Sequence, residues 1–82
     1  MEAQAPPKVT VIVNNKEVVF DDRTVTGLQI KQTAISQGVS IQANFALFEK
    51  KPSGKLRPVP DDEEVHLHPK QEFRAVHADD NS

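Results

Sequence analysis

Residues 9–20 read VTVIVNNKEVVF, two β-prone runs on either side of an asparagine pair. Valine occupies every second position of residues 9–13, as in a half-buried strand whose second face is partly covered. Asn14 and Asn15 tolerate the positive φ angles of a tight hairpin turn. Because residues 16–20 then resume β-prone side chains, we expect a second strand that folds back antiparallel on the first.

The next stretch, DDRTVTGLQIKQTAISQG at residues 21–38, has the start and stop signals of one helix. Thr24 or Thr26 offers a hydroxyl that accepts hydrogen bonds from the free amides of a first helical turn, and Gly38 supplies the C-terminal stop. The apolar stripe between these ends includes Lys31. We expect Lys31 to lay its methylenes on the edge of the core and carry its amine to water; a buried functional lysine is the alternative.

Downstream of the helix, apolar and polar residues alternate again. Residues 45–50 predict a third strand with a large aromatic on each face. Phe45 or Phe48 must then point away from the main core, which suggests an apolar partner surface. Residues 56–59 predict a short fourth strand at a sheet edge or a crossing, because Pro58 cannot donate to an interior ladder.

Residues 65–68 predict a fifth strand, with Val65 and Leu67 facing the core and both histidines facing outward. His66 and His68 share a face and could begin a metal site. The sequence offers no evident third ligand, so we predict no metal site and assign both histidines to ordinary exposed positions.

The length of 82 residues allows one domain at most. Residues 1–7 contain two prolines and no apolar period, which is typical of a flexible leader. We therefore expect one domain over residues 8–69, followed by a C-terminal tail over residues 70–82 that is partly docked and then flexible.

The composition of the chain argues against several classes of function. The net charge is −2, and the ten lysines and arginines are spread along the chain, so nucleic-acid binding is not expected. No apolar run approaches the roughly 18 to 20 residues of a membrane span, and no signal peptide is evident, so we expect a cytoplasmic protein. The chain has no cysteine, and its hydroxyls lack a positioned base and acid. We therefore expect neither an enzyme nor a bound cofactor.

The order hairpin, helix, strand, short strand, strand is that of an α+β, β-grasp fold, in which one helix covers a mixed sheet of four to five strands. Five segments add to this order: residues 11–20, VTGLQIK at 25–31, FALF at 45–48, DDEEV at 61–65 and EFRA at 72–75. Together they resemble the bacterial multiubiquitin family. The resemblance implies a ubiquitin-like protein modifier of a bacterial conjugation pathway, with an E1-like activating enzyme, an E2-like conjugating enzyme, a processing protease and target proteins as partners.

The resemblance implies that the C-terminal tail carries the function. Asp79, Asp80, Asn81 and Ser82 would be the segment that is processed and conjugated, and Ser82 would be removed first to expose Asn81. The last glycine of the sequence is Gly54, so this tail lacks the Gly-Gly ending of ubiquitin. Its two aspartates predict a basic, arginine-bearing groove in the recognising enzyme. A solvated acidic tail that only aids solubility is the alternative.

Two other functions remain open. One is a noncovalent interaction or self-assembly module, with a partner surface made of Phe48, Phe73, Arg74 and Val76 or of a sheet edge. The other is a sulfur carrier, a class that shares the fold and whose members end in Gly-Gly. The missing Gly-Gly makes it the third choice.

Overall fold

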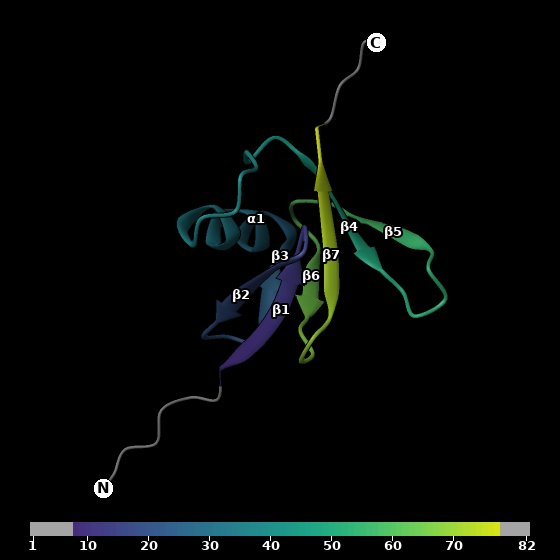
Figure 1. Cartoon of the computed structure of the whole chain (residues 1–82), viewed down its shortest axis with the longest axis horizontal. Coiled ribbons are helices and arrows are strands. Elements are labelled where there is room, and N and C mark those ends of the chain that lie inside the picture. Colours follow the sequence, from purple (N-terminus) through teal and green to yellow (C-terminus); the bar gives the residue numbers. More distant parts are fainter. Residues whose placement is uncertain (1–7, 78–82) are drawn as a thin grey trace, which may run out of the picture.

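The computed structural model describes residues 8–77, which form two sheets and one helix (Figure 1). In chain order the elements are β1 (Val9–Val13), β2 (Lys16–Phe20), β3 (Thr24–Thr26), α1 (Gly27–Ser36), β4 (Ala46–Lys50), β5 (Leu56–Val59), β6 (Glu64–His66) and β7 (Glu72–Val76). The main sheet has the order β2-β1-β7-β4-β5, and β3 pairs with β6. Only the pairing of β1 with β7 is parallel. The predicted α+β, β-grasp architecture is confirmed.

The N-terminal hairpin has the predicted boundaries. Asn14 and Asn15 have φ angles of 51° and 69°, which place both turn residues in the left-handed region. These angles give the turn a twist that matches the twist of the strands. Val13 therefore lies opposite Lys16, and the valines of β1 face the core.

Helix α1 begins with a capping box. The Thr26 hydroxyl accepts a hydrogen bond from the Gln29 amide at 3.2 Å, and the Gln29 side chain accepts one from the Thr26 amide at 2.8 Å. Gly38 follows the helix with a φ of 96°, as predicted for its C-terminal stop. Thr24, the other candidate cap, lies in β3, a strand that the sequence did not predict.

Strand β7 occupies the middle of the main sheet, between β1 and β4. Phe73 lies opposite Val13 on one side, and Ala75 lies opposite Leu47 on the other. The predicted domain boundary at residue 69 was therefore too early, because the folded domain extends through β7. The expected leader over residues 1–7 and the distal part of the expected tail lie outside the described residues.

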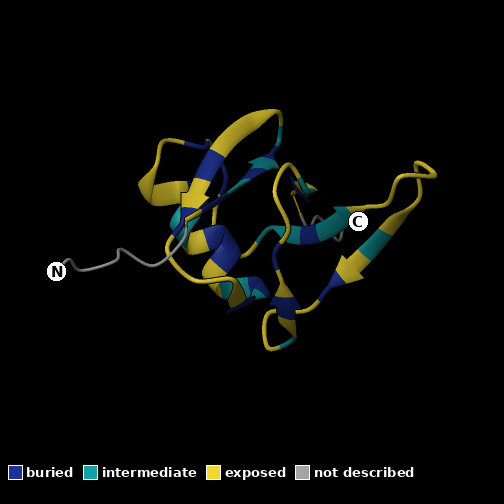
Figure 2. Cartoon of the chain, turned by 90° about the horizontal axis from the view of Figure 1, so that it is seen from below, coloured by how far each residue is buried: buried dark blue, intermediate teal, exposed yellow. Residues whose placement is uncertain are grey.

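Figure 2 colours the chain by burial: buried residues alternate with half-buried ones along β1 and with exposed ones along β7. Ile30 and Ala34 of α1 join the inner valines in one core, so the helix lies against one face of the main sheet. No helix in the described part of the chain is long and apolar enough to cross a membrane.

Both edges of the main sheet are shielded. Strand β5 lies at one edge, as predicted, and Pro58 within it lacks the amide that an added strand would need. At the other edge, the Gln37 side chain accepts a hydrogen bond from the Val19 amide at 2.9 Å and donates one to the Val19 carbonyl at 2.7 Å. The Gln37 amide thus occupies backbone groups through which a neighbouring strand could pair.

The prediction for Lys31 was wrong. Its relative exposure is 3%, and its amine stays inside the molecule. Lys31 Nζ donates to the Phe45 carbonyl at 2.7 Å and lies 2.7 Å from Asp61 Oδ1. A buried charge needs such partners, because burial removes its hydration. The lysine therefore joins α1 to the segments before β4 and after β5.

Candidate functional site

The predicted partner surface lies largely on the outer face of the main sheet, which we define as the face opposite α1. Phe48 of β4 lies directly opposite Pro58 of β5 and Arg74 of β7. The next outward pair is Ala46 and Val76. Phe48 is half-buried, and Arg74 and Val76 are exposed. Pairing in the sheet thus brings Phe48, Arg74 and Val76 together, although β4 and β7 are distant in sequence.

Phe73 does not belong to this surface. Its relative exposure is 3%, and it packs in the core with the other inner residues of the sheet. Successive side chains of a strand point to opposite faces, so Phe73 faces away from its neighbour Arg74. The prediction that Phe73 contacts a partner is therefore corrected.

The outer face combines apolar and charged side chains. Leu56 of β5 is 46% exposed and Val76 is 39% exposed. At one end of this face, Lys50 lies 3.6 Å from Glu72. The face can therefore offer a partner apolar contacts around Phe48 and a cation at Arg74.

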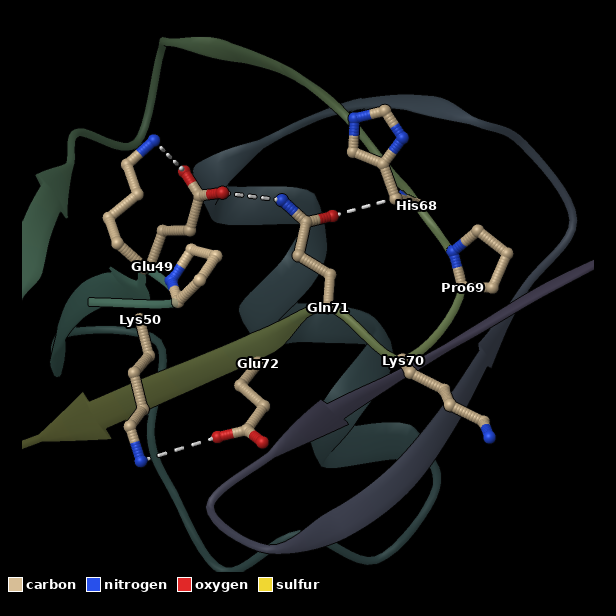
Figure 3. Close-up of a pocket in the computed structure, with 9 residues that line it drawn as sticks. Glu49, Lys50, His68, Pro69, Lys70, Gln71 and Glu72 are labelled. Carbon is tan, nitrogen blue, oxygen red and sulfur yellow. Dashed lines mark hydrogen bonds and ion pairs between the residues drawn. The ribbon is translucent and has the colours of Figure 1, made fainter. Parts of the chain in front are cut away.

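A pocket of about 430 Å³, lined mostly by polar and charged residues, lies at the end of the sheet where β7 begins (Figure 3). It is lined by residues 49–52 and 68–72. Gln71 donates to Glu49 Oε2 at 2.7 Å and accepts a hydrogen bond from the His68 amide at 2.9 Å. The side chain of Glu49 is only 15% exposed. The hydrogen bonds of Gln71 with Glu49 and His68 join β4 to the segment before β7, so these pocket residues help to hold the fold together.

Cations also surround Glu49. Arg57 Nη2 lies 3.3 Å from Glu49 Oε1, Lys51 Nζ lies 3.7 Å from the same oxygen, and Arg57 Nη1 also reaches Glu63 at 2.8 Å. Burial by itself would raise the pKa of Glu49, but the hydrogen bond from Gln71 and the charges of Lys51 and Arg57 outweigh it and hold the pKa below 4.5. The Glu63 hydrogen bond raises the pKa of Arg57.

Glu49→Gln is expected to lower the free energy of unfolding by about 1 kcal/mol at neutral pH. The pKa of Glu49 is lowered in the folded state, so the charged carboxylate stabilises the fold above its ordinary pKa of 4.5. That contribution is lost as the pH falls below this value. Urea unfolding of both proteins between pH 3 and pH 7 measures the difference, which should shrink in acid. A difference that does not change with pH would contradict this origin.

The two histidines of the predicted fifth strand are exposed, as expected. His66 Nδ1 lies 3.2 Å from the Thr24 hydroxyl on the paired strand β3. Within residues 8–77, no group of three or more histidine, cysteine, aspartate or glutamate side chains could hold a metal ion.

The end of β7 is the point from which the chain continues towards the predicted tail. Val76 lies opposite Ala46, and the Asn14 side chain bonds to Ala75 on the other side of the strand. The ring centroids of His77 and Phe45 are 5.2 Å apart. The sequence assigned Asn14 only to the hairpin turn, and no local pattern reveals its contact with β7.

The four predicted tail residues, Asp79, Asp80, Asn81 and Ser82, lie outside the described residues. The structure therefore locates the start of the tail but not these side chains.

A family model described as multiubiquitin matches residues 9–78. The matched span starts with the first residue of β1 and continues past the end of β7, so it includes every described strand and the helix. No curated protein and no solved structure matches the chain. Since the family match covers most of the sequence and agrees with the fold, the chain belongs to the multiubiquitin family, and its domain is a ubiquitin-like β-grasp.

Proposed function

We propose that this chain is a protein modifier of a bacterial ubiquitin-like conjugation pathway. An E1-like enzyme would activate the carboxylate of the tail, and an E2-like enzyme would transfer it to target proteins. Membership of the multiubiquitin family supports this role. The observation that carries it is the position of β7, a central strand held on both sides, which leads directly into the tail.

Activation of the tail requires no catalytic side chain from the domain itself. Adenylation joins the tail carboxylate to the phosphate of a nucleotide, with release of pyrophosphate. This converts the carboxylate oxygen into a good leaving group, which a nucleophile of the enzyme then displaces. The modifier supplies only the electrophilic carbonyl, while the enzymes supply the nucleophiles. A stable domain with a defined tail is sufficient for this task.

The composition of the tail sets requirements for its enzymes. Residues 55–82 contain no glycine, so none of them has the narrow backbone that Gly-Gly would give. Asp79 and Asp80 add negative charge close to the reacting carboxylate. We therefore expect the activating enzyme to hold this tail in a groove with arginine side chains. A protease would first remove Ser82 and expose Asn81 as the new terminus.

Deleting residues 79–82 is expected to abolish formation of the enzyme-linked adduct, because the activated carboxylate and the recognised charges are removed together. The deletion leaves every strand intact, so the unfolding midpoint should change little. Incubation with the E1-like enzyme, ATP and the protease, followed by intact-mass analysis, measures both processing and adduct formation.

The double substitution Asp79→Asn with Asp80→Asn is the matched control, because it keeps the tail length and removes only the charges. It should form the adduct with a raised KM. Failure of the unaltered chain to form an adduct with an active E1-like enzyme would reject the proposal, as would an adduct formed by the deletion variant.

A noncovalent assembly module is the second candidate. The apolar part of the outer face, where the exposed Leu56 and Val76 lie near Phe48, favours it. Because Gln37 and Pro58 shield the two sheet edges, assembly would use this face in preference to strand addition. Sedimentation of the tail-deleted chain separates the two candidates, since face-mediated association should survive the deletion while conjugation should not.

A further inference from the structure

We propose that Asn14 is a positioning residue for the tail. Its side-chain amide holds the last part of β7, so that the chain leaves the domain from one fixed point. This inference rests on the proposed function, because a fixed exit matters most when an enzyme must grip the residues that follow.

The contact consists of two hydrogen bonds between one side chain and one backbone position. Asn14 Nδ2 donates to the Ala75 carbonyl at 2.9 Å, and the Ala75 amide donates to Asn14 Oδ1 at 2.8 Å. The Asn14 amide itself donates to the Phe73 carbonyl at 3.1 Å. The side-chain amide thus bonds Ala75 as the backbone of a neighbouring strand would.

The amide is needed because β1 ends too early. The parallel ladder pairs Ile12 with Glu72 and Val13 with Phe73, and the chain then turns away at Asn14. Without a partner, the backbone groups of Ala75 on this side would lose hydrogen bonds in a partly buried place, which is costly. Asn14 extends the pairing two residues further along β7, close to the tail.

The turn conformation explains why asparagine suits this position. Asn14 has a φ of 51°, which asparagine and glycine adopt more readily than other residues. Of these two residues, only asparagine has a side-chain amide, which can both donate and accept hydrogen bonds. Asn15 has a similar φ of 69° and forms no side-chain bond to β7 among the described residues. The two turn residues therefore make a matched comparison: both have a positive φ, but only Asn14 bonds β7.

A second contact holds the other side of the exit. Val76 lies opposite Ala46 of β4, and the His77 ring packs at a tilt of 55° against the Phe45 ring. The Phe45 carbonyl accepts a hydrogen bond from Lys31 Nζ, which connects this contact to the helix. The base of the tail thus lies between Asn14 and the segment that enters β4.

A fixed base lowers the entropic cost of binding the tail, because fewer backbone angles must be ordered when the enzyme grips it. The benefit applies equally to the bound carboxylate and to its transition state. Loss of the contact should therefore raise KM for activation about fivefold and leave kcat unchanged. A general loss of folding would instead lower the amount of active protein.

The test compares Asn14→Gly with Asn15→Gly in the full chain. Both variants keep a residue that tolerates positive φ, and only the first removes the contact. Amide hydrogen exchange, followed by NMR, should become about tenfold faster at Ala75 in Asn14→Gly and stay unchanged in Asn15→Gly. KM for adenylate formation, measured by pyrophosphate release, should rise only in Asn14→Gly. Asn14→Asp keeps the acceptor and loses the donor, so its exchange rate at Ala75 and its KM should lie between those of the unaltered chain and of Asn14→Gly.

Equal exchange at Ala75 in the two glycine variants would overturn the inference, as would equal KM values. If the unaltered chain is not activated at all, the proposed function fails, and exchange at Ala75 then decides by itself whether Asn14 fixes the exit.

Discussion

Replacing Phe73 by alanine is expected to lower the free energy of unfolding by about 4 kcal/mol. The side chain is 3% exposed and lies on the inner face of the central strand β7. Strands β1 and β4 flank it, so neither can move inward without breaking its own pairing with β7. The cavity left by the ring should therefore stay open, and surrounding side chains would lose their contacts. Urea unfolding followed by circular dichroism measures the loss.

Phe48→Ala provides the comparison, because it removes the same ring from the outer face. Phe48 is half-buried and borders solvent, so this change should cost about 1 kcal/mol. Similar losses for the two variants would contradict the assignment of Phe73 to the core and Phe48 to the surface. A loss of function in Phe73→Ala would therefore be caused by unfolding. A loss of function in Phe48→Ala would instead indicate that the outer face contacts a partner.

Local chemistry made the first half of the fold predictable. The valine alternation, the Asn14–Asn15 turn and the helix signals at Thr26 and Gly38 each act within a few residues. Such short-range preferences agree with the final structure here, which is typical of natural sequences. Alternation along residues 45–50 and 65–68 then predicts two of the later strands, and the family resemblance adds support to the β-grasp order.

The misassigned strands depend on distant partners. Residues 70–82 contain only four apolar side chains, Phe73, Ala75, Val76 and Ala78, and they follow Pro69, so the sequence predicts a tail that includes residues 72–76. Residues 72–76 form a strand because β1 and β4 bond both of their edges. Two of the three residues of β3, Thr24 and Thr26, are candidate helix caps in the sequence, and Thr26 does cap α1. Their assignment to a strand depends on pairing with β6, about forty residues away.

In the candidate site too, some features are predictable from local sequence and others depend on distant partners. Phe48, Arg74 and Val76 were predicted to form a surface, and their cross-strand pairing brings them together. Phe73 was grouped with them, although its alternation with Arg74 places the two side chains on opposite faces of any strand. The Asn14 contact with Ala75 spans 61 positions of sequence and follows from tertiary structure alone.

Lys31 was placed correctly on the apolar stripe of the helix, but the sequence could not supply its partner. Asp61 belongs to the acidic run at residues 61–64, thirty residues later in the chain. Their ion pair forms because the segment after β5 passes the first turns of α1, where the Leu28 amide donates to the Asp61 carbonyl at 3.1 Å. Gly27 permits this approach, since a Cβ there would clash with the Pro60 carbonyl oxygen.

Asp61→Ala is expected to lower the free energy of unfolding by about 3 kcal/mol, and Lys31→Met by about 1 kcal/mol. The Lys31 side chain is 3% exposed, whereas that of Asp61 is 56% exposed. Removing Asp61 leaves a buried ammonium with the Phe45 carbonyl as its remaining partner. Removing the lysine leaves a carboxylate that water still reaches, and methionine fills most of the vacated space.

The double variant Lys31→Met with Asp61→Ala should therefore be about as stable as Lys31→Met alone, because no buried charge remains. Urea unfolding of the three variants at neutral pH measures this pattern. Equal losses for the two single variants would contradict the expectation that an unpaired buried ammonium is the larger cost. The expected pattern also bears on function: an amine held between Asp61 and the Phe45 carbonyl is not free to act as a nucleophile. Under the proposed function, any lysine of this domain that accepted a further modifier molecule would therefore be one of the exposed lysines.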